Sequence, residues 1–223
     1  MELTRIARRR AMDEVYDSLR QAILGHVFRP GDRLQVEEIA EKLGVSLTPV
    51  RHAIQQLATE GLIDIQPRSG TYVAKLSQRD VEETSQIRCA LECLAGDLAV
   101  ERITPKELHE IESVIRSMDR PVESAEDRKR HEADNRRFHI LLVRASGNQR
   151  LAEMYESLNA HLQIARVHSE EQDWQSRLTQ ERAEHEEIFR ALEAGNGKRL
   201  RKALTAHIYR AKDALRKALE AGG

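Results

Sequence analysis

The sequence is poor in aromatic residues and has no long apolar run, and both shortages narrow what the protein can be. Aromatic residues make up only 4% of the 223 residues. Alanine, leucine, glutamate, arginine and lysine dominate instead, a composition that favours helix. No apolar run approaches the ~20 residues that cross a membrane, and the N-terminus MELTRIARRR lacks the apolar core of a signal peptide. We therefore expect a folded, mostly helical protein of the cytoplasm, with no membrane partner.

Cysteine and net positive charge are also scarce. Cys89 and Cys93 are too few for a disulfide framework, and their spacing of one helical turn favours packing in a core over metal or redox chemistry. A net charge of −1 excludes a broad positive field. Any contact with nucleic acid must therefore rely on local clusters, such as the arginines within residues 5–10, although a solvated terminus explains that cluster equally well.

The most informative stretch runs from Pro30 to Val73. Apolar spacing predicts a helix over 36–43, and Gly44 suits its end because a residue without Cβ adopts the left-handed conformation at little cost. A second helix should follow Ser46, whose hydroxyl suits an N-cap. Alternating residues then predict two short strands joined by the loop Pro67–Gly70. This order predicts a helix-turn-helix with a wing.

The second of these helices has one apolar face and one short, mixed polar face. Such a polar face suits insertion into the major groove of DNA, where arginine takes a guanine edge or a phosphate. With the arginine of the wing loop, the candidate DNA contacts are Leu47, Thr48, Arg51, His52, Gln55 and Arg68. The alternative from the pattern alone is a small helical domain whose outer face is merely solvated.

The segments PGDRL, LGVSLTPVRHAI, EGLI and SGTYV resemble the winged-helix domain of GntR-family bacterial transcription regulators. The resemblance covers about Val15 to Val73 and implies binding to double-stranded DNA. The family usually carries Arg after the serine of this motif and Glu after its later arginine. Here those positions hold Leu47 and His52, so one expected base or phosphate contact is missing, while the later arginine is kept as Arg51.

The rest of the chain reads as helices alone. Thr104 and Glu107, on either side of a proline, predict a capping box at the start of one of them. The predicted helices cover about 77–102, 104–118, 125–145, 151–167, 174–194 and 199–221. We expect a mostly α fold, with a winged helix-turn-helix DNA-binding domain over 1–75 and an all-α helical-bundle sensor domain over 76–223.

Three of these helices each carry a histidine within an apolar stripe, namely His139, His185 and His207. A buried imidazole needs a partner for each nitrogen, and a shared divalent metal would satisfy one nitrogen of all three. The alternative is that each histidine hydrogen-bonds separately in the core, and His161, in a similar stripe, shows that the pattern is not unique. For His109 and His131 we expect solvent exposure.

The segments SQIRCALECLAGDLAVER, NRRFHILLVRASGNQRL, EHEEIFRALEAGN and AHIYRA resemble the FCD ligand-binding domain of the FadR-type branch of GntR regulators. In metal-containing members an Asp and three His hold a divalent cation, here zinc or nickel. On this sequence those ligands fall at Asn135, His139, His185 and His207. Asn135 offers a carbonyl oxygen but no charge. The resemblance also implies a small carboxylate effector, for which Arg88 matches a pocket-lining arginine and Arg166 is a second candidate.

Together these patterns predict a transcriptional regulator whose operator binding is modulated by an effector. We expect a homodimer on a palindromic operator, because paired readers match the symmetry of the site. One alternative is a metal-dependent enzyme that uses the three histidines, although the sequence holds no HExxH and no convincing general base beside them. Another is a regulator for which the metal itself is the signal.

Overall fold

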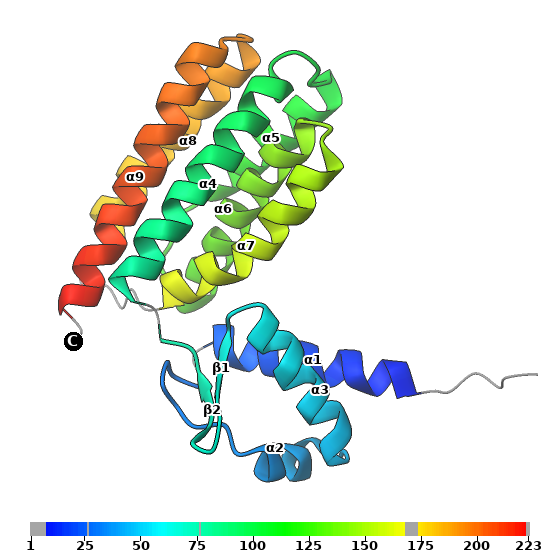
Figure 1. Ribbon diagram of the computed structural model, residues 1–223. Coiled ribbons are helices and arrows are strands. Elements are labelled where there is room, and N and C mark those ends of the chain that lie inside the picture. Colours follow the sequence, from blue (N-terminus) through cyan, green and yellow to red (C-terminus); the bar gives the residue numbers. More distant parts are fainter. Residues whose placement is uncertain (1–7, 26, 76, 168–173, 222–223) are drawn as a thin grey trace, which may run out of the picture. The chain divides into compact units, whose positions relative to one another are not determined.

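The computed structural model describes the backbone of residues 8–25, 27–75, 77–167 and 174–221 (Figure 1). Among the side chains, those of residues 1–10 and 159–177 lie outside the described part, and with them the predicted arginine cluster and Arg166. The chain divides into two compact units, and the main division falls between Ser77 and Gln78. No described helix is long and apolar enough to cross a membrane.

The first unit is the predicted helix-turn-helix with a wing. Its elements are α1 (Arg8–Leu24), α2 (Val36–Leu43), α3 (Leu47–Thr59), β1 (Ile63–Gln66) and β2 (Gly70–Val73). The two strands pair antiparallel, and α1 packs against α3 around a core of aliphatic side chains. Gly44 ends α2 at φ 65°, in the left-handed region that was expected of it. Ser46 stands at the N-cap of α3, but its side chain makes no capping hydrogen bond, so the predicted hydroxyl cap was wrong.

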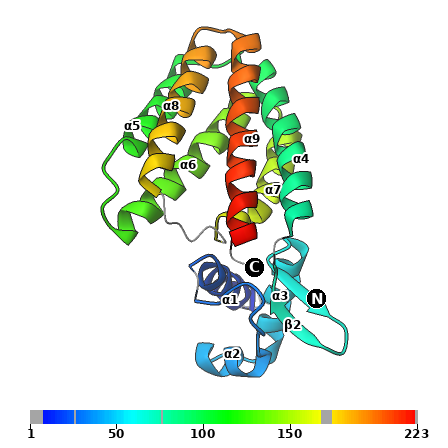
Figure 2. The same cartoon turned by 90° about the vertical axis from the view of Figure 1, so that its left-hand side faces the viewer.

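The second unit is built from helices alone. They are α4 (Gln78–Ala99), α5 (Pro105–Met118), α6 (Ala125–Ala145), α7 (Gln149–Val167), α8 (Trp174–Glu193) and α9 (Gly197–Ala221). α9 packs against both α4 and α8, and α6 packs against α4 and α5 (Figure 2). The core between them is apolar, with Phe138 and Leu142 from α6, Ile188 and Leu192 from α8, and Leu204 from α9. These apolar stripes fix which side of α6, α8 and α9 turns inward.

The capping box at the start of α5 is confirmed. The Glu107 amide donates to the Thr104 hydroxyl at 3.3 Å, and the Thr104 amide donates to the Glu107 carboxylate at 2.8 Å. We expect Thr104→Ala to lower the free energy of unfolding by about 1 kcal/mol, because it leaves the Glu107 amide without its side-chain acceptor. Urea unfolding measures this, with Ser46→Ala as the control, since Ser46 holds an N-cap position without a capping bond. Equal losses in the two variants would contradict the prediction.

Candidate functional site

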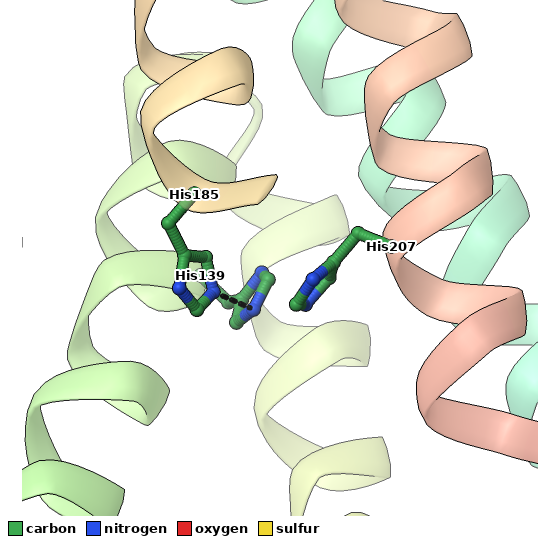
Figure 3. Close-up of side chains that lie close together, drawn as sticks. All are labelled: His139, His185 and His207. Atoms are coloured by element: carbon green, nitrogen blue, oxygen red, sulfur yellow. Dashed lines mark hydrogen bonds between the residues drawn. The ribbon is translucent and has the colours of Figure 1, made fainter. Parts of the chain in front are cut away.

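Three histidines meet in the core of the second unit. His139 comes from α6, His185 from α8 and His207 from α9, and each is at most 2% exposed. One ring nitrogen from each lies within 4.8 Å of the others, and the rings approach one another from separate helices (Figure 3). The Nε2 atoms of His139 and His185 are 3.4 Å apart. Zinc–nitrogen bonds of ~2.0–2.1 Å place tetrahedral ligands roughly 3.3–3.4 Å apart, so this spacing fits a shared ion.

Two of the rings are held from behind by carboxylates. The Nδ1 atom of His139 lies 2.9 Å from Glu92 Oε2, and that of His207 lies 2.8 Å from Glu184 Oε2. A carboxylate only accepts, so each Nδ1 carries the proton and each Nε2 keeps its lone pair. Carboxylate–histidine pairs of this kind orient metal ligands in proteins. The donor set therefore fits a divalent ion, and the three histidines are the residues that would hold it.

Burial keeps the rings of His185 and His207 neutral. It lowers the pKa of His185 and His207 well below the usual value near 6.5, and the neighbouring imidazoles lower it further. A histidine must be neutral to bind a metal. Nδ1 of His185 is buried and has no hydrogen-bond partner in the described part of the chain. The site is thus prepared to receive a cation at physiological pH.

A buried ion-pair network adjoins the histidines. Arg88 Nε donates to Glu92 Oε1 at 2.6 Å, and the Tyr155 hydroxyl donates to the same oxygen at 2.8 Å. Burial alone would raise the pKa of Glu92, but the charge of Arg88 and the hydrogen bond to His139 hold it far below its usual range. Arg88 Nη2 also lies 3.0 Å from His139 Nε2. The structure therefore brings Arg88, the first candidate for effector binding, to the histidine cluster.

Asn135 and His131 extend the stripe of His139 along α6. Both are buried, so the expectation that His131 is exposed to solvent was wrong. Residues 131, 135 and 139 follow one another at intervals of four and share one helix face, which turns inward. His109, by contrast, is exposed as expected. Asn135 Nδ2 donates to the carboxylate of Glu181 on α8, and His131 Nε2 lies 3.6 Å from the same oxygen.

The outer face of α3 carries the residues of that helix that are predicted to contact DNA. Its apolar face is buried through Val50, Ala53, Ile54 and Leu57. The candidate DNA contacts are all exposed, namely Leu47, Thr48, Arg51, His52, Gln55 and, in the wing loop, Arg68. Arg68 has φ 66°, an unusual conformation for a long side chain. It lies at the turn between the two strands.

Family comparisons agree with both units. The sequence model described as bacterial regulatory proteins of the gntR family matches residues 11–73. The model described as the FCD domain matches residues 83–210, which is more than half of the chain. The chain belongs to the GntR family. Within that family it has the FadR-type arrangement, a GntR helix-turn-helix followed by an FCD domain.

Individual GntR relatives match nearly the whole length. The repressor RspR of Escherichia coli K12 is 30% identical over 203 residues, covering 91% of this chain and 88% of RspR. A probable repressor of the D-xylose utilization operon of Paenarthrobacter nicotinovorans is 32% identical, covering 92% and 88%. The solved structure of E. coli McbR/YncC superposes with a TM-score of 0.76 at 25% identity, covering 92% and 96%. These relatives are transcriptional regulators and not enzymes, so the metalloenzyme alternative is set aside.

Four buried or half-buried partners in this GntR-family protein were missed from the sequence. They are Glu92, Tyr155, Glu181 and Glu184. Glu92 had a signal, since it follows Arg88 by one helical turn. Glu181 had a similar one, because it precedes His185 by the same interval. Tyr155 had no local signal, because it reaches Glu92 from a different helix.

Proposed function

We propose that this regulator binds a palindromic operator in double-stranded DNA as a homodimer and that its FCD domain holds zinc or nickel at His139, His185 and His207. A small carboxylate effector binds at or beside that metal and modulates operator binding. The carboxylates behind His139 and His207 carry the proposal. They hold Nδ1 of both rings and so leave Nε2 of each ring as the nitrogen that can bind a metal. Histidines that served only to fill the core would not need two buried rings oriented by carboxylates.

The charge at the site supports an anionic effector. Three neutral imidazoles leave the charge of a divalent ion uncompensated by its direct ligands, and such an excess favours a negative group in the remaining positions. Arg88 adds a buried guanidinium beside His139. We place the effector carboxylate there and keep Arg166 as a second effector contact. The effector would shift operator binding by favouring one of two arrangements of the dimer.

Metal analysis of the purified full-length protein tests the site. We expect about one divalent ion per chain, and a chelator should lower the melting temperature because an ion bound only to the folded state stabilises it. Absence of metal, with no uptake of added zinc or nickel, would overturn the site. Sequencing of genomic fragments retained by the protein tests the DNA half. The retained chromosomal fragments should share a palindromic sequence. Retention of fragments with no shared sequence would overturn the proposal of a specific operator.

Arg51 is the residue of α3 that we expect to contribute most to operator binding. It is exposed on the outer face of the helix and is not in an ion pair among the described residues. Arg51→Ala should weaken binding to the operator by about 1–3 kcal/mol if the guanidinium reads a base, and less on DNA of random sequence. Gel-shift titration measures both affinities. Arg150→Ala removes the same charge from the second unit and serves as the control; equal affinities of the two variants would exclude Arg51 from the interface.

A further inference from the structure

One amide–carboxylate pair links α6 to α8 beside the histidine cluster. Asn135 lies one helical turn before His139, and Glu181 lies one turn before His185. Residues four apart share a helix face, so both side chains point to the interior that the histidines occupy. Both are only 6% exposed, and Asn135 Nδ2 donates a hydrogen bond to Glu181 Oε1. A buried, hydrogen-bonded carboxylate therefore lies one helical turn from the histidine cluster.

The hydrogen bond decides which way the Asn135 amide faces. A carboxylate can only accept, so the atom turned towards Glu181 must be the nitrogen. The carbonyl oxygen Oδ1 then points elsewhere. It is buried and has no hydrogen-bond partner in the parts of the chain that the structure describes. Leaving a buried acceptor unsatisfied costs roughly 1–3 kcal/mol, and such an exception calls for a functional explanation.

We infer that Asn135 is the fourth metal ligand, through Oδ1, and that Glu181 supports it without binding the ion. Glu181 orients the amide of Asn135 and supplies the negative charge that the amide lacks. This inference rests on the proposed metal site. It assigns Glu181 as a positioning residue, because its carboxylate is not among the ligand atoms that lie within 4.8 Å of one another.

The charge of Glu181 reaches the cluster. Glu181 lies one helical turn before His185 and contacts Asn135, which lies one turn before His139. A carboxylate buried beside three imidazoles would stabilise a cation held between them. The same carboxylate oxygen of Glu181 lies 3.6 Å from His131 Nε2. A charged group this deeply buried is costly without such a use, since burial of a carboxylate disfavours its ionised form.

Glu181→Gln is the informative change. Glutamine keeps the volume and can still accept the hydrogen bond from Asn135, so the variant removes charge with little change of shape. Metal-stripped full-length protein is titrated with zinc by calorimetry, and the melting temperature of each metal-free variant is recorded. We expect Glu181→Gln to bind zinc about 10–100-fold more weakly, the usual effect of losing an outer partner of a metal ligand. Asn135→Ala, which removes Oδ1, should also weaken binding.

The double variant Asn135→Asp with Glu181→Gln is the matched control. It exchanges amide and carboxylate between the two helices, preserves the hydrogen bond and restores the charge. It should recover wild-type zinc affinity or exceed it. Asn135→Asp alone brings two carboxylates together, so its metal-free form should melt at a lower temperature and zinc should restore it.

The cobalt(II) spectrum separates a ligand from its positioning residue. Asn135→Ala should alter the visible absorption bands of the cobalt-loaded protein because a coordinating atom is lost. Glu181→Gln should leave the positions of these bands unchanged, although a higher cobalt concentration should be needed to produce them. If wild type and Glu181→Gln bind zinc equally, the inference is overturned while the metal site stands. If the wild-type protein binds neither zinc nor nickel, the metal site itself is overturned, and this inference with it.

Discussion

Replacing Glu92 by alanine should lower the free energy of unfolding by about 3–5 kcal/mol, the usual cost of breaking a buried ion pair from one side. Glu92 is fully buried and receives hydrogen bonds from Arg88, Tyr155 and His139. Without it, the guanidinium of Arg88 stays in the core with no opposing charge. Urea unfolding at neutral pH measures the loss.

The Glu92 carboxylate also makes stability depend on acid. Its folded pKa lies well below the unfolded value of about 4.3 because, although burial raises it, Arg88 and His139 lower it more. The contribution is therefore complete above about pH 4.3 and is lost as the pH falls towards the folded pKa. The alanine variant should lack this part of the acid dependence.

A matched pair on the same helix serves as the control for Glu92. Arg79 and Glu83 have the same spacing of four residues on α4, at 2.7 Å, but both are exposed to solvent. Glu83→Ala should change stability little, because water screens such a pair. A second variant, Arg88→Met with Glu92→Leu, removes both buried charges and should recover much of the lost stability. If Glu92→Ala were as stable as Glu83→Ala, the buried network would contribute nothing to folding.

Stripped of metal, the protein should lose stability steeply between pH 6.5 and 5.5. The folded pKa of His185 and that of His207 are well below 6.5, so the unfolded chain takes up protons first as the pH falls. Their stabilising contribution is thus complete above about pH 6.5 and declines below it. Each histidine can contribute up to about 1.4 kcal/mol of unfolding free energy per pH unit, and the two together up to about 2.7 kcal/mol per pH unit.

Urea unfolding in a chelating buffer at several pH values measures this slope. His185→Gln and His207→Gln should each reduce it, whereas His109→Asn should not, because the side chain of His109 is 78% exposed. Added zinc should reduce the loss near pH 6.5, since metal competes with protons for the same nitrogens, and fail at lower pH. A stability that stays level down to pH 5.5 in the chelator would contradict the prediction.

The spacing of apolar residues predicts which face of a single helix is buried. The apolar neighbours of His139, His185 and His207 were sufficient to place the three rings inward, because a helix face is fixed by spacing alone. The outer face of α3 was predictable for the same reason. His131 failed because it lies in a highly charged run, AEDRKRHEADNRR, where the inward stripe holds polar residues and hydrophobic periodicity gives no signal.

Partners across helices could not be predicted in this way. Glu92 meets His139, and Glu181 meets Asn135, only because α4, α6 and α8 pack together. These side chains hydrogen-bond to one another across the helices. Such pairing depends on how the helices pack and leaves no periodic pattern in the sequence. Ser46 shows the opposite error: the residue type and position suit a cap, but the side chain is turned away from the amides.

The position of Glu92 along α4 has a mechanical consequence. The chain leaves the wing at Val73, and α4 begins five residues later at Gln78. At a rise of 1.5 Å per residue, Glu92 stands about 21 Å along the helix from that start. A helix is stiff over this length, so a small tilt imposed on α4 where it contacts His139 becomes a larger displacement at its first turn. If the proposed effector tilts α4 at Glu92, we therefore expect the largest displacement where α4 joins the linker to the helix-turn-helix, and substitutions in the first turns of α4 should change this displacement without contacting either proposed ligand.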